Sequence, residues 1–473
     1  MTRLTRSKTE WLLFAALVLF VNTKAQQVHE LTLQQSVDMA IKNVVELKNL
    51  NLDYKNAVYK NREITAGALP QINGTLTGQH FFAVPTSVLP NFISPATYQV
   101  LANEGVKDGN GQPIQAVSPN DLPPIQAQFG VPWSVSAGFT VQQLLFQPDV
   151  FVGLQARGAA LDFAKLNIAV ANDKVKQGVQ NSYYLILVSN QQMELLNAGV
   201  TRLEKLLSDA TQIYKNGFTE KLDLDRTKVA LNNLKTTRQQ LLNTVQLANA
   251  LLKYNIGVSQ KDSIVLTEKL TDETIKRNLL DEMSFTYENR NEIKLLNTVE
   301  KLQRLDLKRN QLQYIPTIAA YWNYSRNAQR REFDIFKSGS AYPWFPNSIA
   351  GININVPLWS SGARKNKILQ SKITVEKAVN TTDFVKQSID LEIEQSKINY
   401  RNAILNMDAQ KDNRELALSV YNTTKKKYEQ GLASNQDVLL AENELQAAQG
   451  NYFQSLYNAV IAQVAYKRAV GNL

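Results

Sequence analysis

One short pattern occurs twice in this chain, each time at the end of a very long stretch without internal proline. Each copy consists of a tyrosine, a glycine three residues later and an aspartate six residues after that glycine: Tyr214, Gly217 and Asp223 in the first copy, and Tyr428, Gly431 and Asp437 in the second. Glycine just past a helical stretch can take the left-handed backbone conformation that ends a helix, so each copy predicts the turn of a helical hairpin. Another glycine follows each turn glycine by 40 residues, Gly257 and Gly471, which indicates an internal duplication.

The helices around these turns are unusually long. We expect helices over about 148–214 and 360–428 before the turns, and over about 218–256 and 434–470 after them. At about 1.5 Å per residue, each of the first two would be about 100 Å long, which no compact domain needs. Apolar residues in the second of them recur mostly three, four or seven apart, as in the narrow stripe of a coiled coil.

Each half begins with one shorter helix, over about 33–68 in the first half and about 285–314 in the second. Pro70 and Pro316 follow them, and proline ends a helix because it cannot donate to the helical hydrogen-bond ladder. We therefore expect these prolines to mark the passage from helix to strand in both halves.

Strand periodicity follows each proline. Residues 134–146 alternate, with Val135, Ala137, Phe139 and Val141 on one face and small polar residues on the other. Residues 316–325 and 349–359 alternate in the same way, and a weaker strand covers about 72–82. Loops 81–133 and 326–348 connect the strands within each pair, and only this region differs in length between the halves.

The strands allow two interpretations. Strands of about ten residues with one apolar and one polar face fit a transmembrane β-barrel, although a soluble β-sandwich alternates equally well. Four strands cannot close a barrel, and an open edge cannot lie in lipid, so a barrel would have to be shared by several chains.

The N-terminus has the pattern of an export signal over residues 1–25: basic residues, the apolar run 11–21, and small residues at its end. The chain contains no cysteine, so no disulfide stabilises the exported protein. Its net charge of +10 is spread along the sequence, which argues against nucleic acid as a partner. Residues 258–284, between the halves, predict a short strand over 263–270 and one helix that gird the rods.

No pattern indicates an enzyme. His29 and His80 stand far apart in the sequence, so we predict no catalytic residues, no metal site and no cofactor. The competing function is that of a protein without a pore, either a periplasmic adaptor or a coiled-coil adhesin.

The signal peptide, the duplicated order of helix, strand, loop, strand, helix, turn and helix, and the two tyrosine-glycine-aspartate turns together resemble the TolC family of outer-membrane efflux channels. The resemblance covers essentially the whole mature chain. It implies an α+β membrane protein: a homotrimer with a 12-stranded transmembrane β-barrel, four strands per chain, continued by a 12-helix α-barrel in the periplasm. Residues 26–257 and 285–473 would be its structural repeats, 258–284 its equatorial segment, and loops 81–133 and 326–348 would be extracellular.

The resemblance also implies a function and partners. The protein would lie in the cell outer membrane, in contact with its lipid, and extend into the periplasm. It would be the exit duct of a tripartite efflux or type I secretion system, docked to a periplasmic adaptor (membrane fusion) protein and an inner-membrane pump of the RND or ABC type.

The family's closed tip carries a tyrosine link and rings of aspartate, which implies a periplasmic gate at the two turns. The corresponding residues here are Asp223, Asp437, Tyr428 and, as the first-half counterpart, Tyr214, with Gly217 and Gly431 as the turn glycines. The chain departs from the family pattern at Ala433, where some members have an arginine of the link, and at Leu440, where some have a second aspartate. The alternatives are a helix-start role for both aspartates and a packing role for Tyr428.

Overall fold

The computed structural model describes residues 28–271, 275–276 and 285–473. The expected export signal lies outside the described residues, as does part of the equatorial segment. The chain divides into two compact units. One, the helical unit, comprises the described parts of Met1–Tyr59, Ala156–Leu305 and Gln370–Leu473; the other, the sheet unit, comprises Lys60–Gln155 and Asp306–Leu369.

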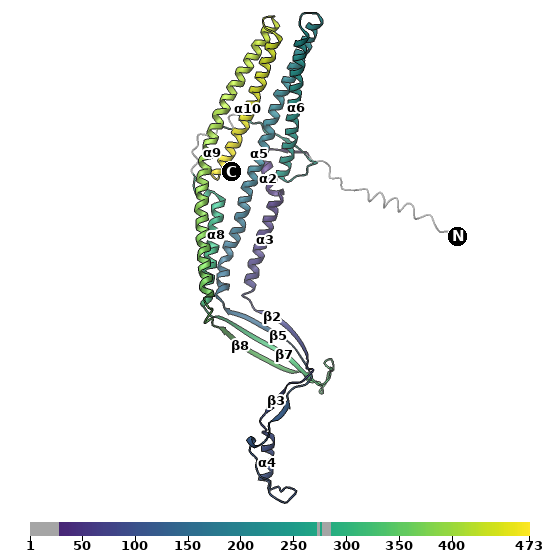
Figure 1. Cartoon of the computed structure of the whole chain (residues 1–473), viewed down its shortest axis with the longest axis vertical. Helices are drawn as coiled ribbons and strands as arrows, with labels where there is room; N and C mark the ends of the chain where they lie inside the picture. Colours follow the sequence, from purple (N-terminus) through teal and green to yellow (C-terminus); the bar gives the residue numbers. More distant parts are fainter. Residues whose placement is uncertain (1–27, 272–274, 277–284) are drawn as a thin grey trace, which may run out of the picture. The chain divides into compact units, whose positions relative to one another are not determined.

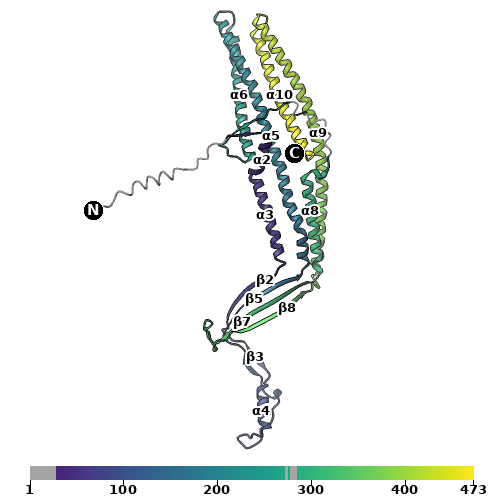
Figure 2. The ribbon, with the colours of Figure 1, turned by 180° about the vertical axis from the view of Figure 1, so that it is seen from behind.

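Two helical hairpins dominate the helical unit (Figure 1). The first hairpin joins α5 (Pro148–Lys215) to α6 (Lys221–Ile256), and the second joins α9 (Ala363–Glu429) to α10 (Asn435–Ala469). Figures 1 and 2 show both turns at the same end of this unit. The helices α5 and α9, of 68 and 67 residues, are the long rods expected from the sequence.

The shorter helices differ from the expected ranges. The stretch 33–68 is divided into α2 (Leu33–Asn43) and α3 (Val45–Ala66), because Val44 has an extended backbone (ψ 127°). In the second half, α8 (Asn291–Gln311) begins later than predicted, after a 3-10 turn over Tyr287–Asn289, and ends in another over Leu312–Tyr314.

The break at Val44 and the late start of α8 lie at equivalent close contacts in the two halves. Gly257, with φ 69°, lies so close to Asn43 that an added Cβ would be 2.9 Å from the Asn43 carbonyl carbon. Gly471, with φ 75°, lies against Asn289 at the same 2.9 Å. The end of each return helix therefore packs on the backbone where the next helix begins, as an internal duplication would produce.

Apolar side chains fill the helical unit in two clusters. One lies in the middle of the unit and the other toward the turns, around Leu203, Leu231 and Leu445. The middle cluster includes the fully buried residues Tyr183, Ile186, Leu252, Ile256 and Met407.

The described part of the equatorial segment is held by polar side chains of the rods. Strand β6 (Ser263–Leu266), shorter than the expected 263–270, pairs in parallel with β1 (Val28–Leu31). Tyr183 donates to the Leu31 carbonyl at 3.2 Å, and Tyr400 donates to the Ile275 carbonyl at 2.6 Å. Burial raises the pKa of both hydroxyls, so they remain protonated donors.

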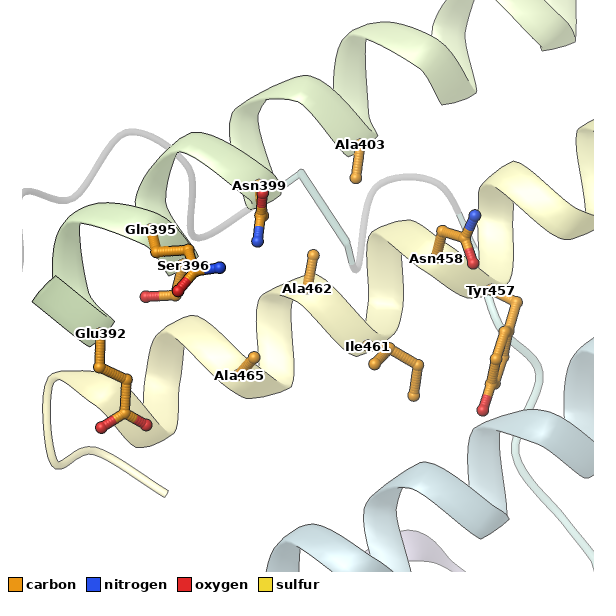
Figure 3. Close-up of a pocket in the computed structure, with 10 residues that line it drawn as sticks. All are labelled: Glu392, Gln395, Ser396, Asn399, Ala403, Tyr457, Asn458, Ile461, Ala462 and Ala465. Atoms are coloured by element: carbon orange, nitrogen blue, oxygen red, sulfur yellow. The ribbon is translucent and has the colours of Figure 1, made fainter.

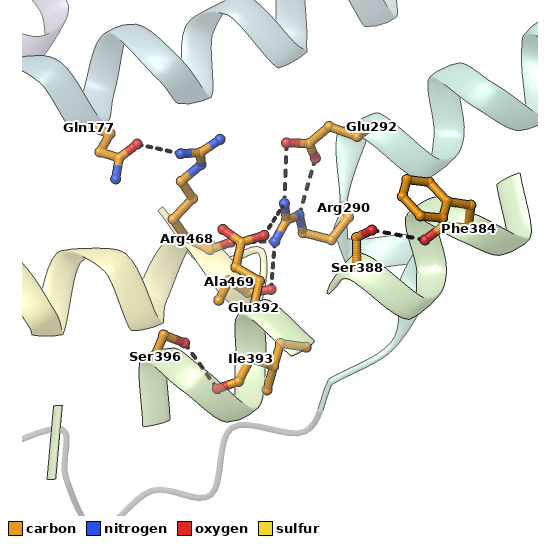
Figure 4. Close-up of polar contacts among 10 residues, drawn as sticks. All are labelled: Gln177, Arg290, Glu292, Phe384, Ser388, Glu392, Ile393, Ser396, Arg468 and Ala469. Atoms are coloured by element: carbon orange, nitrogen blue, oxygen red, sulfur yellow. Dashed lines mark hydrogen bonds and ion pairs between the residues drawn. The ribbon is translucent and has the colours of Figure 1, made fainter. Parts of the chain in front are cut away.

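Arg290 closes the C-terminal end of α10 (Figure 4). Its guanidinium, on a residue only 4% exposed, donates to the carbonyls of Arg468 and Ala469 and forms ion pairs with Glu292 and Glu392. The last carbonyls of a helix lack intrahelical partners and carry a partial negative charge. A buried guanidinium at this position supplies hydrogen bonds to these carbonyls and offsets the negative charge.

The sheet unit contains a four-stranded antiparallel sheet in the order β2 (Gln71–His80), β5 (Trp133–Phe146), β7 (Thr317–Arg330) and β8 (Phe345–Asn355). Figures 1 and 2 show these strands side by side. Pro70 and Pro316 directly precede β2 and β7. Strands β2 and β8 are the outer strands, so each has one neighbour in this sheet.

The register gives this sheet two chemically different faces, because directly opposed residues point to the same side. One row consists of Ile72, Val141, Trp322 and Ala350. A row on the opposite face consists of Thr75, Gly138, Ser325 and Asn347. The alternation expected from the sequence is therefore continuous across the strands.

The loops differ from the expected ones. Strand pairing continues to Asn327 and Phe345, and β7 extends to Arg330, so the second loop is shorter than 326–348. The first loop has structure of its own: β3 (Thr86–Leu89) pairs with β4 (Ile125–Gln128), and α4 (Ile93–Asn103) and a 3-10 turn (Pro119–Asp121) lie between them. None of the helices in the described part of the chain is long and apolar enough to cross a membrane.

The close approach of β5 to β7 gives a first prediction. A Cβ on Gly138 would meet the Tyr324 carbonyl oxygen and lie 2.7 Å from the Ser325 Cα. Gly138→Ala should therefore force the strands apart and destabilise the protein by about 1–3 kcal/mol. Gly74→Ala on the adjacent strand is the matched control, since its nearest neighbour would be 4.0 Å away. Thermal unfolding of the detergent-purified protein measures both; equal melting temperatures for the two variants would contradict the packing described.

Candidate functional site

The two hairpin turns have the same backbone geometry. Gly217 and Gly431 have φ values of 81° and 76°. Their N–H groups donate to the carbonyls of Tyr214 and Tyr428 at 2.9 and 3.0 Å. The N–H groups of the residues that follow, Phe218 and Leu432, reach back to carbonyls five residues earlier at 3.1 and 2.8 Å, which completes a helix-ending motif of the Schellman type.

Beyond the turn, the second hairpin begins with a capping box. The Ser434 hydroxyl accepts the Asp437 N–H at 3.1 Å, and the Asp437 carboxylate accepts the Ser434 N–H at 2.8 Å. The Ser434 hydroxyl also donates to that carboxylate at 2.7 Å. These bonds, that of the backbone N–H first, lower the pKa of Asp437. The exposed carboxylate therefore makes the helix-start contacts of the alternative interpretation while it stays ionised.

Asp223, the counterpart in the first hairpin, has a different environment. Its carboxylate accepts a hydrogen bond from the Thr219 hydroxyl at 2.9 Å and lies 3.9 Å from the Arg226 guanidinium. Glu220, the first residue before α6, makes no side-chain capping bond. Asp223 is therefore half-buried beside a cation, whereas Asp437 is fully exposed.

Two side-chain bridges join the hairpins near their turns. Asn435, only 7% exposed, donates to the Asp223 carbonyl at 3.2 Å and to the Thr227 hydroxyl at 3.0 Å. Arg226 donates to the Gln436 side chain at 2.8 Å. The first hairpin thus supplies an arginine for a bridge although the second has Ala433 at the family's arginine position.

The sequence pattern does not single out the four residues of these bridges, Arg226, Thr227, Asn435 and Gln436. They are ordinary polar residues at helix starts, and no motif distinguishes them. The hydrogen bond from the buried Asn435 amide to the Thr227 hydroxyl joins residues 208 apart in the chain, so it becomes evident only in the three-dimensional structure.

The two predicted tyrosines occupy different environments. Tyr428 is half-buried and packs against the apolar cluster nearest the turns, which fits the packing alternative. Burial, and then the charges of Asp209 and Asp223, raise its pKa, so its hydroxyl stays neutral at physiological pH. Tyr214 is exposed, and its backbone carbonyl rather than its ring is what closes the turn.

Large apolar side chains are exposed at both turns. Phe218 and Leu432, which directly follow the turn glycines, are 84% and 73% exposed. Each turn therefore presents one large apolar side chain to solvent at the same position, at the end of the helical unit.

Other candidate sites lack a set of reactive groups. A groove of about 480 Å³ lies between α9 and α10, lined by small and amide side chains such as Ser396, Asn399 and Ala462 (Figure 3). His29 lies 3.5 Å from Asp262 in the helical unit, while the His80 ring packs at a tilt against the Trp133 ring in the sheet unit. Within the described residues, no group of three or more His, Asp or Glu side chains is placed to hold a metal ion.

Comparison with known proteins gives a family resemblance for one part of the chain and a fold for the whole. Residues 302–472 match the family described as outer membrane efflux protein. No curated protein matches significantly. Among solved structures, CusC, described as forming a transmembrane channel, is 14% identical, with 93% of this chain and 92% of that one covered and a TM-score of 0.70.

Two further structures are similar over the same share of this chain. The CmeC outer membrane channel of Campylobacter jejuni is 14% identical, with 93% and 85% of the chains covered and a TM-score of 0.69. The outer membrane protein VceC of Vibrio cholerae is 16% identical, with 93% and 96% covered and a TM-score of 0.67. Residues 302–472 are therefore similar to the outer membrane efflux protein family, and the chain as a whole has the fold of these solved structures.

Proposed function

We propose that this protein is the outer-membrane exit duct of an efflux or secretion system. The observation that carries the proposal is the combination, in one chain, of a two-faced sheet with open outer strands and paired helical hairpins of great length. In a single chain, neither the sheet nor the hairpins enclose a channel. Several copies of the chain arranged around an axis would enclose one with their sheets and one with their hairpins.

The sheet supports a trimer. Strands β2 and β8 present unpaired backbone groups at the outer edges of the four-stranded sheet. In lipid such groups have no water to bind, so the edges must pair with another copy. Three copies joined β2 to β8 give the 12-stranded barrel that the family resemblance implies.

The two faces of the sheet support its orientation. Ile72, Leu76, Ile352 and Ile354 lie on the apolar face and are well exposed in the single chain. The opposite face carries Thr, Ser, Asn and Gly, as in a barrel with lipid outside and water inside. A soluble adaptor or adhesin would leave these isoleucines and leucines in water, which disfavours the alternative without a pore.

The helical unit supports the same assembly. Four exposed apolar residues of α9 follow one another at seven-residue intervals: Phe384, Leu391, Ile398 and Leu405. Val45, Leu52 and Tyr59 follow one another at the same interval on α3. Heptad spacing is the mark of a stripe that packs on another helix, so these stripes are suited to the neighbouring copies of a 12-helix α-barrel.

The hairpin turns are then the periplasmic gate, with Asp437, Asp223, Tyr428 and Tyr214 around the axis. Phe218 and Leu432 are suited to contact a periplasmic adaptor protein, which in turn meets an inner-membrane pump of the RND or ABC type. The protein would lie in the outer membrane and extend into the periplasm, without enzymatic activity or a cofactor. Detergent-dependent solubility and a heat-sensitive trimer on gel electrophoresis would support this assignment, and a soluble monomeric mature protein would refute it.

The lipid face can be tested by a pair of substitutions on β5. Phe139→Arg should destabilise the inserted protein by about 2–4 kcal/mol if it lies near the bilayer midplane. Ser136→Arg, on the opposite face of the same strand, should be tolerated because it meets water. Folding into vesicles under urea titration measures both, and equal tolerance would favour a soluble sandwich.

The gate can be tested through its charge. A ring of three Asp437 carboxylates would favour cations, because carboxylate rings select cations in narrow pores. Asp437→Asn keeps an oxygen acceptor for Ser434 but removes the charge, so the cation preference in planar-bilayer recordings should fall toward none. Asp223→Asn is the control; since Arg226 lies beside Asp223, the effect should be smaller.

The same recordings have a defined pH dependence. The pKa of Asp437 is lowered from 3.8, so its charge is present above that value and is lost only as the pH falls through the lower pKa. Three such carboxylates close together would raise one another's pKa, so a cation preference that persists down to about pH 4 would show that the Ser434 bonds outweigh this repulsion. Selectivity unchanged in Asp437→Asn, with trimers intact, would reduce Asp437 to its capping role.

A further inference from the structure

Glu442 in α10 is the only carboxylate among the described residues that is almost completely buried, at 1% exposure. It lies between the hairpins and forms a two-pronged ion pair with Arg202 of α5: Nε to Oε2 at 2.9 Å, and Nη2 to Oε1 at 2.8 Å. The pair joins the first hairpin to the second, because α5 and α10 belong to different hairpins.

Both charges have further partners. Gln446 donates to Glu442 Oε1 at 2.7 Å, and the Arg202 guanidinium lies over the Tyr421 ring of α9, 5.2 Å from its centroid. Gly199 provides the space, since a Cβ there would meet the Gln446 side chain and lie 3.3 Å from Glu442 Oε1. Burial alone lowers the pKa of Arg202, but the hydrogen bonds and charge of Glu442 outweigh it and the pKa is raised.

The surroundings of the pair are apolar. Leu203, Leu206, Val438, Leu439 and Leu445 belong to the same buried cluster. Apolar contact is not directional, so a narrow stripe of leucines allows one helix to slide along another. A planar guanidinium-carboxylate pair with two parallel hydrogen bonds has one favoured geometry, so it does not allow the helices to slide.

Stability alone does not account for such a pair. Burial of two charges is expensive, and replacing them with apolar residues of similar size is often neutral or stabilising. A buried polar contact is best attested as a means of fixing register between helices. Arg202 lies 15 residues before Gly217 and Glu442 lies 11 residues after Gly431, so the pair is about 20 Å from the turns.

We propose that Arg202 and Glu442 are a positioning pair that sets the axial register of the two hairpins and so brings the tip bridges of Arg226 with Gln436, and of Asn435 with Thr227, into contact. The proposal rests on the proposed gate at the turns, and it adds two residues about 20 Å from the turns that stabilise the closed position of the tips. With the pair broken, the hairpins still pack through their leucines but shift, and the tips no longer meet in register.

Two variants separate positioning from stability. Glu442→Gln removes one charge and keeps an acceptor for Gln446. The double variant Arg202→Met/Glu442→Leu removes both charges and keeps the packing volume, so its melting temperature should stay near that of the wild type. Glu204→Gln is the matched control, because it breaks the exposed ion pair of Glu204 with Lys235, which lies within one hairpin.

The readout is the proximity of the tips in the full-length protein. The chain has no cysteine, so Arg226→Cys/Gln436→Cys introduces the only two thiols, and a short bismaleimide should join them within one chain. Mass spectrometry of tryptic fragments gives the yield. We expect a high yield in this background and with Glu204→Gln, and a clearly lower yield with Glu442→Gln and with the double apolar variant.

Leak through the closed channel is the second readout, recorded with the native tip residues. Both pair variants should raise the fraction of open time about tenfold, which equals about 1.4 kcal/mol in the closed-state equilibrium. Wild-type yield and leak in the double apolar variant would overturn the proposal, as would a lower melting temperature of Glu442→Gln with yield and leak unchanged. Absence of any current from the wild type would refute the proposed channel instead, and the cross-link comparison would still decide the role of the pair.

Discussion

The outer edges of the four-stranded sheet are the constraint on which the proposed assembly depends. Backbone N–H and C=O groups on β2 and β8 need partners, and lipid supplies none. Because one chain has only four strands, the proposed closure by three copies would satisfy every edge. In that proposal the helical hairpins of the three copies would likewise form a tube in place of a compact bundle.

A tube made of narrow apolar stripes has little to fix the position of its helices along their length. The structure supplies directional contacts at intervals: Tyr183 donates to a backbone carbonyl of β1, Tyr400 donates to one of the equatorial segment, and Arg290 donates to the last carbonyls of α10. Nearer the turns, Asn435 and the pair centred on Glu442 bridge the hairpins. Each of these contacts pairs a donor with an acceptor away from water, which makes it directional and specific.

Local signals in the sequence were sufficient for the elements but not for the contacts between them. Glycine and proline punctuation and the two periodicities predict the rods, the turns and the four strands to within a few residues. The break at Val44 was missed because its cause, the approach of Gly257 to Asn43, joins segments far apart in the chain. The bridge from Asn435 to Thr227 was missed for the same reason, since single-sequence patterns carry no information on pairing in space.

The duplicated turns share a backbone but differ in charge. In the second hairpin Ser434 supplies the capping bonds, and the Asp437 carboxylate stays exposed and ionised. In the first, Arg226 lies beside Asp223 and also reaches the other hairpin. The first hairpin therefore supplies the charged group of the bridge between the tips, and the second supplies the exposed carboxylate for the proposed pore.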